Sequence, residues 1–177
     1  MQDLVRWLAP AAALVAPHCY AVQYLSVEQA QSAIFADARE FVPAPVRLSR
    51  EQAREIERLS GVRVRVPEQA VWEARAHGKL LGWFAVDEVI GKHELITYAV
   101  GIDVGGSVRQ IEVMNYREAY GYEIRNAAWR RQFAGKRAGD TLKLDQDIRN
   151  ITGATLSCRH ITDGVRRLLA LHHVALR

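Results

Sequence analysis

From residue 62 the apolar side chains recur at every second position, as Val62, Val64 and Val66 do, which is the period of a β-strand that buries one face. The segments that predict strands are 62–66, 71–76, 80–86, 95–102 and 108–114. Short turns that contain glycine separate the last four segments into two hairpins. In the second turn, Gly105 and Gly106 can adopt the positive φ that a tight hairpin needs. This stretch therefore predicts a meander of about five antiparallel strands.

Helical patterns stand on both sides of the strands. Ser26 and Ser49 each precede a glutamine by three residues, which is the spacing of a capping box. Apolar residues at helical spacing follow both serines, and Gly61 is placed to end the second helix. Residues 126–133 predict a short helix, and residues 155–172 predict a C-terminal helix. The order favours an α+β fold: an antiparallel twisted sheet of about five strands, with the C-terminal helix packed on it and two N-terminal helices.

The first 21 residues have the layout of a secretory signal. An apolar run over 7–16 is followed by small residues up to Ala21, after which we expect cleavage. The alternative is an apolar helix packed on the domain, which Pro10 and Pro17 disfavour. We therefore expect a periplasmic or otherwise extracytoplasmic protein. The expected divisions are a signal peptide at 1–21, a helical extension at 22–61 and the main domain at 62–177.

Composition and motifs exclude several classes of function. The chain has 24 Lys and Arg against 20 Asp and Glu, and the two signs are interleaved without a nucleic-acid-binding motif, so we expect no nucleic-acid partner. Two cysteines exclude a four-cysteine metal site, and we expect no metal. The chain lacks the G-x-S-x-G motif of a hydrolase and the glycine-rich loops that bind nucleotide phosphates. No side chain is assigned a catalytic role.

The segment 150–157, with the sequence NITGATLS, is the most specific feature of the chain. Gly153 permits a tight turn and a close approach to the backbone. Thr155 falls at the start of the C-terminal helix, where free N–H groups and the helix dipole favour a phosphate. Thr152 and Ser157 supply further hydroxyls. The alternative is an ordinary capped helix start, with Thr152 or Thr155 as the N-cap.

This segment resembles the S/T-G-A-T flavinylation motif of the FMN-binding domain family. The family occurs in subunits of the sodium-pumping NADH:quinone oxidoreductase (Nqr) and the related Rnf complexes, and as small exported proteins. The resemblance covers about residues 70–172. It includes Gly82-Trp83-Phe84, then 100–103 with Gly106, and then the loop 116–121, in the family's order.

The resemblance implies a covalent cofactor. In the family, the second hydroxyl residue of the motif is esterified through the FMN phosphate by a flavin transferase of the ApbE type, and the corresponding residue here is Thr155. The expected cofactor-binding residues are Thr155, Thr152, Gly153, Ala154, Leu156, Ser157, Glu118, Tyr120, Lys92 and His93. Candidate walls for the flavin ring are Trp83, Tyr98, Tyr116 and Tyr120.

Each candidate also has a purely structural interpretation. Trp83 and Tyr98 suit the core of the sheet. Lys92 and His93 are equally compatible with a solvated turn. Glu118 has arginines nearby in the sequence with which it can pair, but the loop position in the family favours Glu118 and Tyr120 as contacts.

The resemblance implies an exported electron-transfer flavoprotein, a redox carrier that exchanges electrons with a membrane or extracytoplasmic partner. One position departs from the family. Many members have Asp three residues before the first hydroxyl residue, where this chain has Arg149, with Asp147 and Asn150 nearby as substitutes. This departure supports the alternative function, a binding or structural domain outside the membrane that keeps the fold without flavin.

Overall fold

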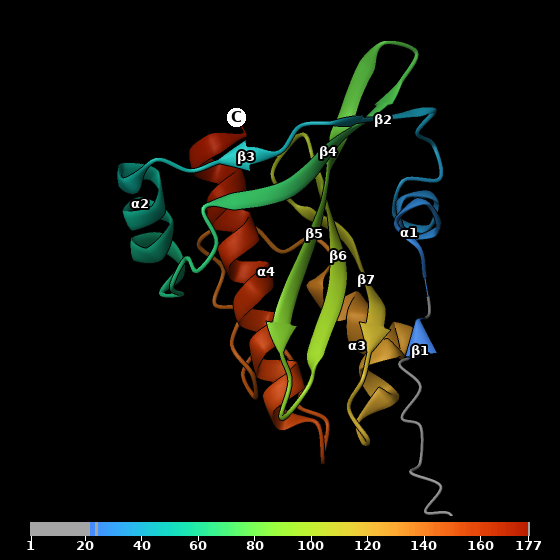
Figure 1. Ribbon diagram of the computed structural model, residues 1–177, viewed down its shortest axis with the longest axis vertical. Coiled ribbons are helices and arrows are strands. Elements are labelled where there is room, and N and C mark those ends of the chain that lie inside the picture. Colours follow the sequence, from blue (N-terminus) through green and yellow to red (C-terminus); the bar gives the residue numbers. More distant parts are fainter. Residues whose placement is uncertain (1–21, 24, 177) are drawn as a thin grey trace, which may run out of the picture.

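The structure is a computed structural model that describes residues 22, 23 and 25–176. The predicted signal peptide lies outside the described residues. One antiparallel sheet runs through the centre of the molecule, with helices on both of its faces (Figure 1). Within the described residues, the sheet has seven strands in the order β1-β7-β6-β5-β4-β2, and β3 also pairs with β4. No described helix is long and apolar enough to cross a membrane.

The strands are β1 (Val22–Gln23), β2 (Glu40–Pro43), β3 (Val46–Arg47), β4 (Glu68–Ala76), β5 (Lys79–Ile90), β6 (Leu95–Asp103) and β7 (Val108–Tyr116). The helices are α1 (Val27–Ile34), α2 (Arg50–Ser60), α3 (Ala127–Arg130) and α4 (Thr155–Ala175), with 3-10 turns η1 (Tyr122–Arg125) and η2 (Arg131–Phe133). The predicted α+β class, with its antiparallel sheet, C-terminal helix and N-terminal helices, is confirmed. Both hairpins and both capping boxes also form as predicted.

The predicted strand over 62–66 is wrong. The backbone N–H of Val64 donates to the side chain of Glu57 at 2.8 Å, and that of Val62 donates to the Ser60 hydroxyl at 3.1 Å. These bonds hold the segment against the end of α2, so it forms no ladder with the sheet. The alternation of valine and arginine carried no information about a partner strand.

The structure also places three short strands in the segment 22–61, where the sequence predicted helices and a connector. β2 pairs with β4 from Glu40–Arg75 to Pro43–Trp72, and β1 pairs with β7. Strands of two to four residues show no period, so the pattern could not reveal them.

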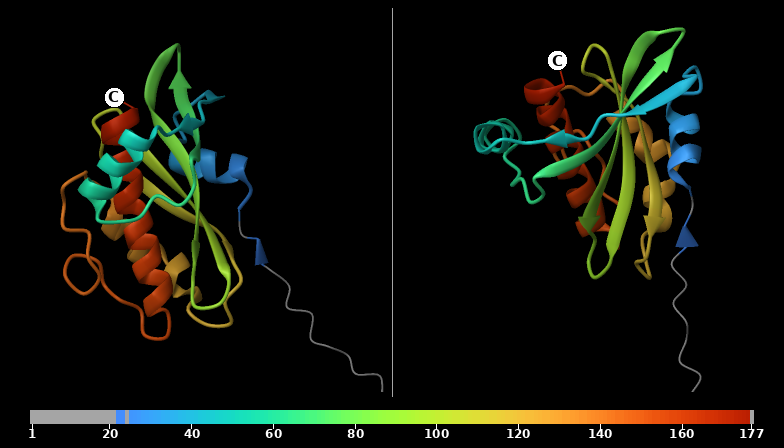
Figure 2. Two further views of the ribbon diagram at one scale, coloured as in Figure 1. Left: turned by 60° about the vertical axis from the view of Figure 1, so that its left-hand side comes forward. Right: turned by 45° about the horizontal axis from the view of Figure 1, so that its top comes forward.

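The two faces of the sheet carry separate hydrophobic cores. α4 packs on one face over a core that includes Ile111, Val165 and Leu168, and α1 packs on the other face over Phe84 and Met114. Figures 1 and 2 show the two helices on opposite sides of the strands.

A buried polar network fixes α4 along the sheet. Arg167 Nη2 lies 2.6 Å from Asp87 Oδ1, and the Tyr98 hydroxyl donates to Asp87 Oδ2 at 2.5 Å. Gly164 is the point of closest approach, because a Cβ there would lie 2.0 Å from the Tyr98 hydroxyl oxygen. With these contacts made, the N-terminus of α4 reaches the end of the sheet where β5 turns into β6 (Figure 1).

Candidate functional site

Three segments that are distant in sequence meet at this end of the sheet. They are the loop and first turn of α4 (152–157), the β5–β6 turn (91–94) and the loop that follows β7 (117–121). Between them lies a hollow of about 740 Å³. The structure brings all ten residues expected to bind the cofactor to its lining: Lys92, His93, Glu118, Tyr120, Thr152, Gly153, Ala154, Thr155, Leu156 and Ser157.

The N-terminus of α4 has no side-chain cap. Its N-cap is Ala154, with φ −123° and ψ 21°, and no side chain accepts a hydrogen bond from the first turn. The interpretation of Thr152 or Thr155 as the N-cap is therefore wrong. By contrast, α1 and α2 have the side-chain N-caps Ser26 and Ser49, each in a complete capping box. The first N–H groups of α4 lack intrahelical acceptors and face the hollow, where the positive end of the helix dipole favours an anion.

Thr155 is half-buried at this helix start. Its Oγ1 accepts a hydrogen bond from Asn150 Nδ2 at 3.2 Å. Asn150 Oδ1 is buried and has no hydrogen-bond partner within the described residues. A buried acceptor without a donor is costly, so the geometry favours a donor supplied from outside the chain.

Glu118 organises the turn that forms the opposite wall. Its Oε1 accepts the backbone N–H of His93 at 2.6 Å and that of Glu94 at 3.1 Å. Partial burial opposes ionisation of this carboxyl, but the N–H groups of His93, Glu94 and Lys92 outweigh it and hold its pKa below the ordinary value. Gly91 leaves room for this contact, since a Cβ there would lie 2.4 Å from Glu118 Oε1. Glu118 thus positions the solvated turn that carries Lys92 and His93.

Gly121 allows the loop after β7 to pack against the start of α4. Its φ is +90°, and a Cβ there would lie 2.4 Å from the Ala154 Cβ and 2.8 Å from the Tyr116 hydroxyl. The Tyr116 hydroxyl donates to the Tyr120 carbonyl. Burial raises the pKa of the Tyr116 phenol, whereas its hydrogen bond with Ser157 lowers it.

Aromatic and apolar side chains stand open at the mouth of the hollow. Tyr120 is 77% exposed, Tyr122 54% and Leu156 39%. Exposed apolar side chains that gather around one concavity are typical of a ligand or partner site. Tyr120 therefore keeps its place as a candidate wall for a flavin ring, whereas Tyr116 lines the hollow but is only 3% exposed.

Two of the four candidate walls lie elsewhere. Trp83 packs edge-on against His172, with ring centroids 4.6 Å apart, and Tyr98 is fully buried beneath α4. Both are core residues: Trp83 packs near the C-terminal end of α4 and Tyr98 packs under its middle at Gly164, away from the end of the sheet that holds the hollow. Asp147 does not face Thr155 either. It pairs with Lys136 Nζ at 2.8 Å and accepts backbone N–H groups of Leu142 and Lys143.

Cys158 lies in the core of the protein. Burial raises the pKa of the Cys158 thiol to about 11, so at neutral pH it is an inert core thiol. No group of three or more His, Cys, Asp or Glu side chains in the described part of the chain is arranged to hold a metal ion.

Sequence reasoning missed several residues of the lining. Ala119, Gly121, Tyr122 and Glu123 all border the hollow. Gly121 was the available signal, since a glycine between two tyrosines in a loop marks a position that needs positive φ. Tyr122 and Glu123 lie on η1, a single 3-10 turn that leaves no periodic trace in the sequence.

Comparison with known proteins gives a match to a family in sequence and matches to solved structures in fold. Residues 91–170 match the FMN-binding domain family. No curated protein matches the sequence. The fold is similar to the crystal structure of Shewanella oneidensis NqrC, with a TM-score of 0.53 and 13% sequence identity. That alignment covers 82% of this chain and 88% of the NqrC chain, and at this identity it shows a shared fold.

Proposed function

We propose that the chain is an exported electron-transfer flavoprotein with FMN esterified to Thr155, on the premise that residues 91–170 match the FMN-binding domain family. The observation that carries the proposal is the placement of Thr155. Its hydroxyl lies in a cofactor-sized hollow at a helix N-terminus that no side chain caps.

The residues of the hollow fit an FMN group. Its volume of about 740 Å³ falls in the usual range of small-molecule sites. The uncapped first turn of α4 offers N–H groups to a phosphate, and the unpartnered Asn150 Oδ1 offers an acceptor to a hydroxyl or N–H donor. Tyr120 supplies aromatic surface for a ring.

Attachment requires a single substitution at phosphorus. A flavin transferase of the ApbE type would use FAD: the Thr155 oxygen bonds to the FMN phosphorus, the pyrophosphate bond breaks, and AMP leaves with the hydroxyl proton. Asn150 Nδ2 donates to Thr155 Oγ1, and this hydrogen bond leaves the hydroxyl proton free to depart. An ester oxygen still accepts a hydrogen bond, so Asn150 can position Thr155 before and after modification.

A bound FMN supplies reversible transfer of one or two electrons. The chain itself holds the cofactor and shapes its surroundings. Covalent attachment makes retention independent of affinity, which matters for a protein exported into a dilute compartment. Lys92 and His93, held by Glu118, place donors at one wall of the hollow, and the tyrosines enclose another. We propose a membrane or extracytoplasmic redox protein as the partner.

Intact mass measurement tests the attachment. The protein is purified from the extracytoplasmic fraction of its own host, beside Thr155→Ala and, as the matched control, Thr152→Ala. We expect wild type and Thr152→Ala to be heavier than the chain by one FMN less one water, and Thr155→Ala to lack the increment. The same spectra report whether residues 1–21 have been removed.

The second candidate function is a domain that keeps the fold without flavin. It is favoured by Arg149, whose exposed side chain stands where many family members have an aspartate. An unmodified, colourless wild type from a host with an active flavin transferase would exclude the first function and leave this one.

A further inference from the structure

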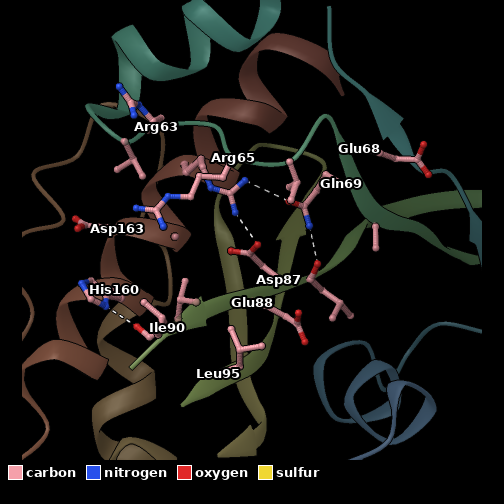
Figure 3. A pocket seen from close by; sticks show the side chains of 17 residues that line it. Arg63, Arg65, Glu68, Gln69, Asp87, Glu88, Ile90, Leu95, His160 and Asp163 are labelled. Atoms are coloured by element: carbon pink, nitrogen blue, oxygen red, sulfur yellow. Dashed lines mark hydrogen bonds and ion pairs between the residues drawn. The ribbon is translucent and has the colours of Figure 1, made fainter. Parts of the chain in front are cut away.

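A second hollow, of about 830 Å³, lies beside the β5–β6 hairpin (Figure 3). It is lined by the segment 62–66, the start of β4, the end of β5 and the middle of α4, and it shares no lining residue with the flavin hollow. The two hollows are close neighbours, because Ile90 and Leu95 line this one while the turn between them faces the other. Nothing in the proposed attachment of FMN uses it.

One wall of this hollow is an open strand edge. The pairing of β4 with β5 ends at Ala70–Val86, because β4 turns away there to pair with β3, whereas β5 continues beside β6 to Ile90–Leu95. The Gly91 N–H donates to the Glu94 carbonyl, so the backbone groups of Gly91 point toward β6. Because these groups alternate along a strand, the backbone N–H and C=O groups of Glu88 and Ile90 point to the other side, which β4 has left. His160 Nδ1 contacts the Ile90 carbonyl at 2.5 Å, and the Gln69 side chain donates to the Val86 carbonyl at 2.5 Å. Between these bonds, Glu88 has no strand partner on this side.

The side chains around the edge combine apolar surface with unpaired cations. Val66, Ile90 and Leu95 are 48–50% exposed, which is unusual for large apolar residues. Arg63 and Arg65 have no hydrogen bond or ion pair within the described residues, although both line the hollow.

The carboxylates of the hollow are already engaged. Their partners are Arg47 for Glu68, Arg167 for Asp87, Thr97 for Glu88 and Arg166 for Asp163. Glu88 keeps its negative charge, since its partner is a neutral hydroxyl. Arg63 and Arg65 are the lining arginines without a partner within the described residues, and the charge that they attract is negative. Figure 3 shows both arginines across the hollow from Glu88 and Leu95.

We propose that this second hollow, called the groove below, binds an extended peptide segment of the redox partner as an added strand along residues 87–90 of β5. An added strand would take the place that β4 vacates and pair with the free backbone groups of Glu88. Its apolar side chains would cover Ile90, Leu95 and Val66, and its acidic side chains would pair with Arg63 and Arg65. Docking here would hold the partner next to the flavin hollow. The inference rests on the proposed function only where it identifies the protein that carries this peptide segment as a redox partner.

The groove itself is tested with a short blocked peptide of alternating glutamate and valine, titrated into the isotope-labelled protein at low salt. The readout is the backbone amide shifts. We expect saturable shifts at 62–66 and 87–90, and none with the matching lysine–valine peptide. Arg63→Glu with Arg65→Glu should weaken binding by about tenfold, since each exposed pair contributes up to about 1 kcal/mol. Arg39→Glu, on an exposed arginine outside the hollow, is the matched control and should bind as wild type.

A second pair of variants tests strand addition. Glu88→Pro removes the edge N–H without breaking the β5–β6 ladder, because that N–H points away from β6. Glu88→Ala removes the same side chain and keeps the N–H. We expect Glu88→Pro to abolish peptide binding and Glu88→Ala to retain it. Binding that survives in both variants overturns the proposal, as does the absence of saturable shifts.

A fatty carboxylate such as decanoate distinguishes a small-molecule site. Shifts at 62–66 and 87–90 with decanoate and none with the peptide would overturn the peptide proposal. All titrations are repeated on Thr155→Ala, in which the groove is intact. Failure of flavinylation and failure of peptide docking are thus recorded separately.

Discussion

Glu118 shows how a residue expected to touch the cofactor can act through its neighbours. Its carboxylate accepts hydrogen bonds from two backbone N–H groups of the β5–β6 turn, at 2.6 and 3.1 Å. It therefore holds a wall of the hollow in place. The sequence placed Glu118 at the site by its position in the loop. It could not show this partner, because the turn is some 25 residues away and backbone donors leave no mark in the sequence.

Removal of this charge should loosen the turn. Glu118→Gln is expected to cost about 1 kcal/mol of unfolding free energy at pH 7, since charged acceptors bind N–H groups more strongly than neutral ones. The folded pKa lies below 4.5, so the contribution is complete above pH 4.5 and is lost as the pH falls through the folded pKa. Urea unfolding at neutral and acidic pH measures it. The control is Glu94→Gln in the same turn, and an equal loss in both variants would contradict this role.

Gly121 provides a second test at the residue scale. An alanine there would combine a strained φ of +90° with overlap against Ala154 and Tyr116. Gly139 is the matched control, since its φ is +97° and a Cβ there meets nothing within 4 Å. We expect Gly139→Ala to cost about 1 kcal/mol from backbone strain alone. Gly121→Ala should cost a further 1–3 kcal/mol, roughly the effect of overpacking, with lower FMN content. Equal urea midpoints for the two variants would show that the contact with Ala154 is not tight.

Among the elements, α4 connects the core to the site. Its start, its length and its apolar stripe followed from the sequence, because a long amphipathic period is the strongest local signal. Its position along the sheet did not, since that depends on Asp87, Tyr98 and Arg167, which come from three different elements. The same reason explains why Trp83 and Tyr98 were candidates for the site: aromatic residues in strands look alike whether they stand at the middle or the end of a sheet.

The contact between α4 and β6 can be measured by a double-mutant cycle. Gly164→Ala should destabilise the protein by about 1–3 kcal/mol, because overlap with the Tyr98 hydroxyl outweighs the gain of about 1 kcal/mol in helix propensity. In the Tyr98→Phe background the hydroxyl is gone, so the loss should shrink by more than about 0.5 kcal/mol. Tyr116→Phe is the control background, in which the effect of Gly164→Ala should be unchanged. Additivity with Tyr98→Phe would show that the helix is not held at this point.

For the whole molecule, the strand meander and the helix order were predictable, whereas the contribution of residues 22–61 was not. α1 fills the second face of the sheet through Ile34 and Phe35, and Gly101 makes room for it, since a Cβ there would lie 2.2 Å from Ile34 Cγ2. β2 covers the outer edge of β4. Both are long-range pairings between short segments, which a local pattern does not encode.

A chain that begins at residue 62 tests whether the main domain stands alone. Loss of α1 would expose Phe84, Ala99 and Met114 to water, and loss of β2 would leave the edge of β4 unpaired. We therefore expect residues 62–177 to unfold without a cooperative transition, to bind hydrophobic dyes and to aggregate. Residues 22–177 should unfold cooperatively under the same conditions, as the control that lacks only the predicted signal peptide. A cooperative transition for 62–177 with a midpoint close to that of the control would instead show that the main domain folds without residues 22–61, which the sequence predicted to be a helical extension.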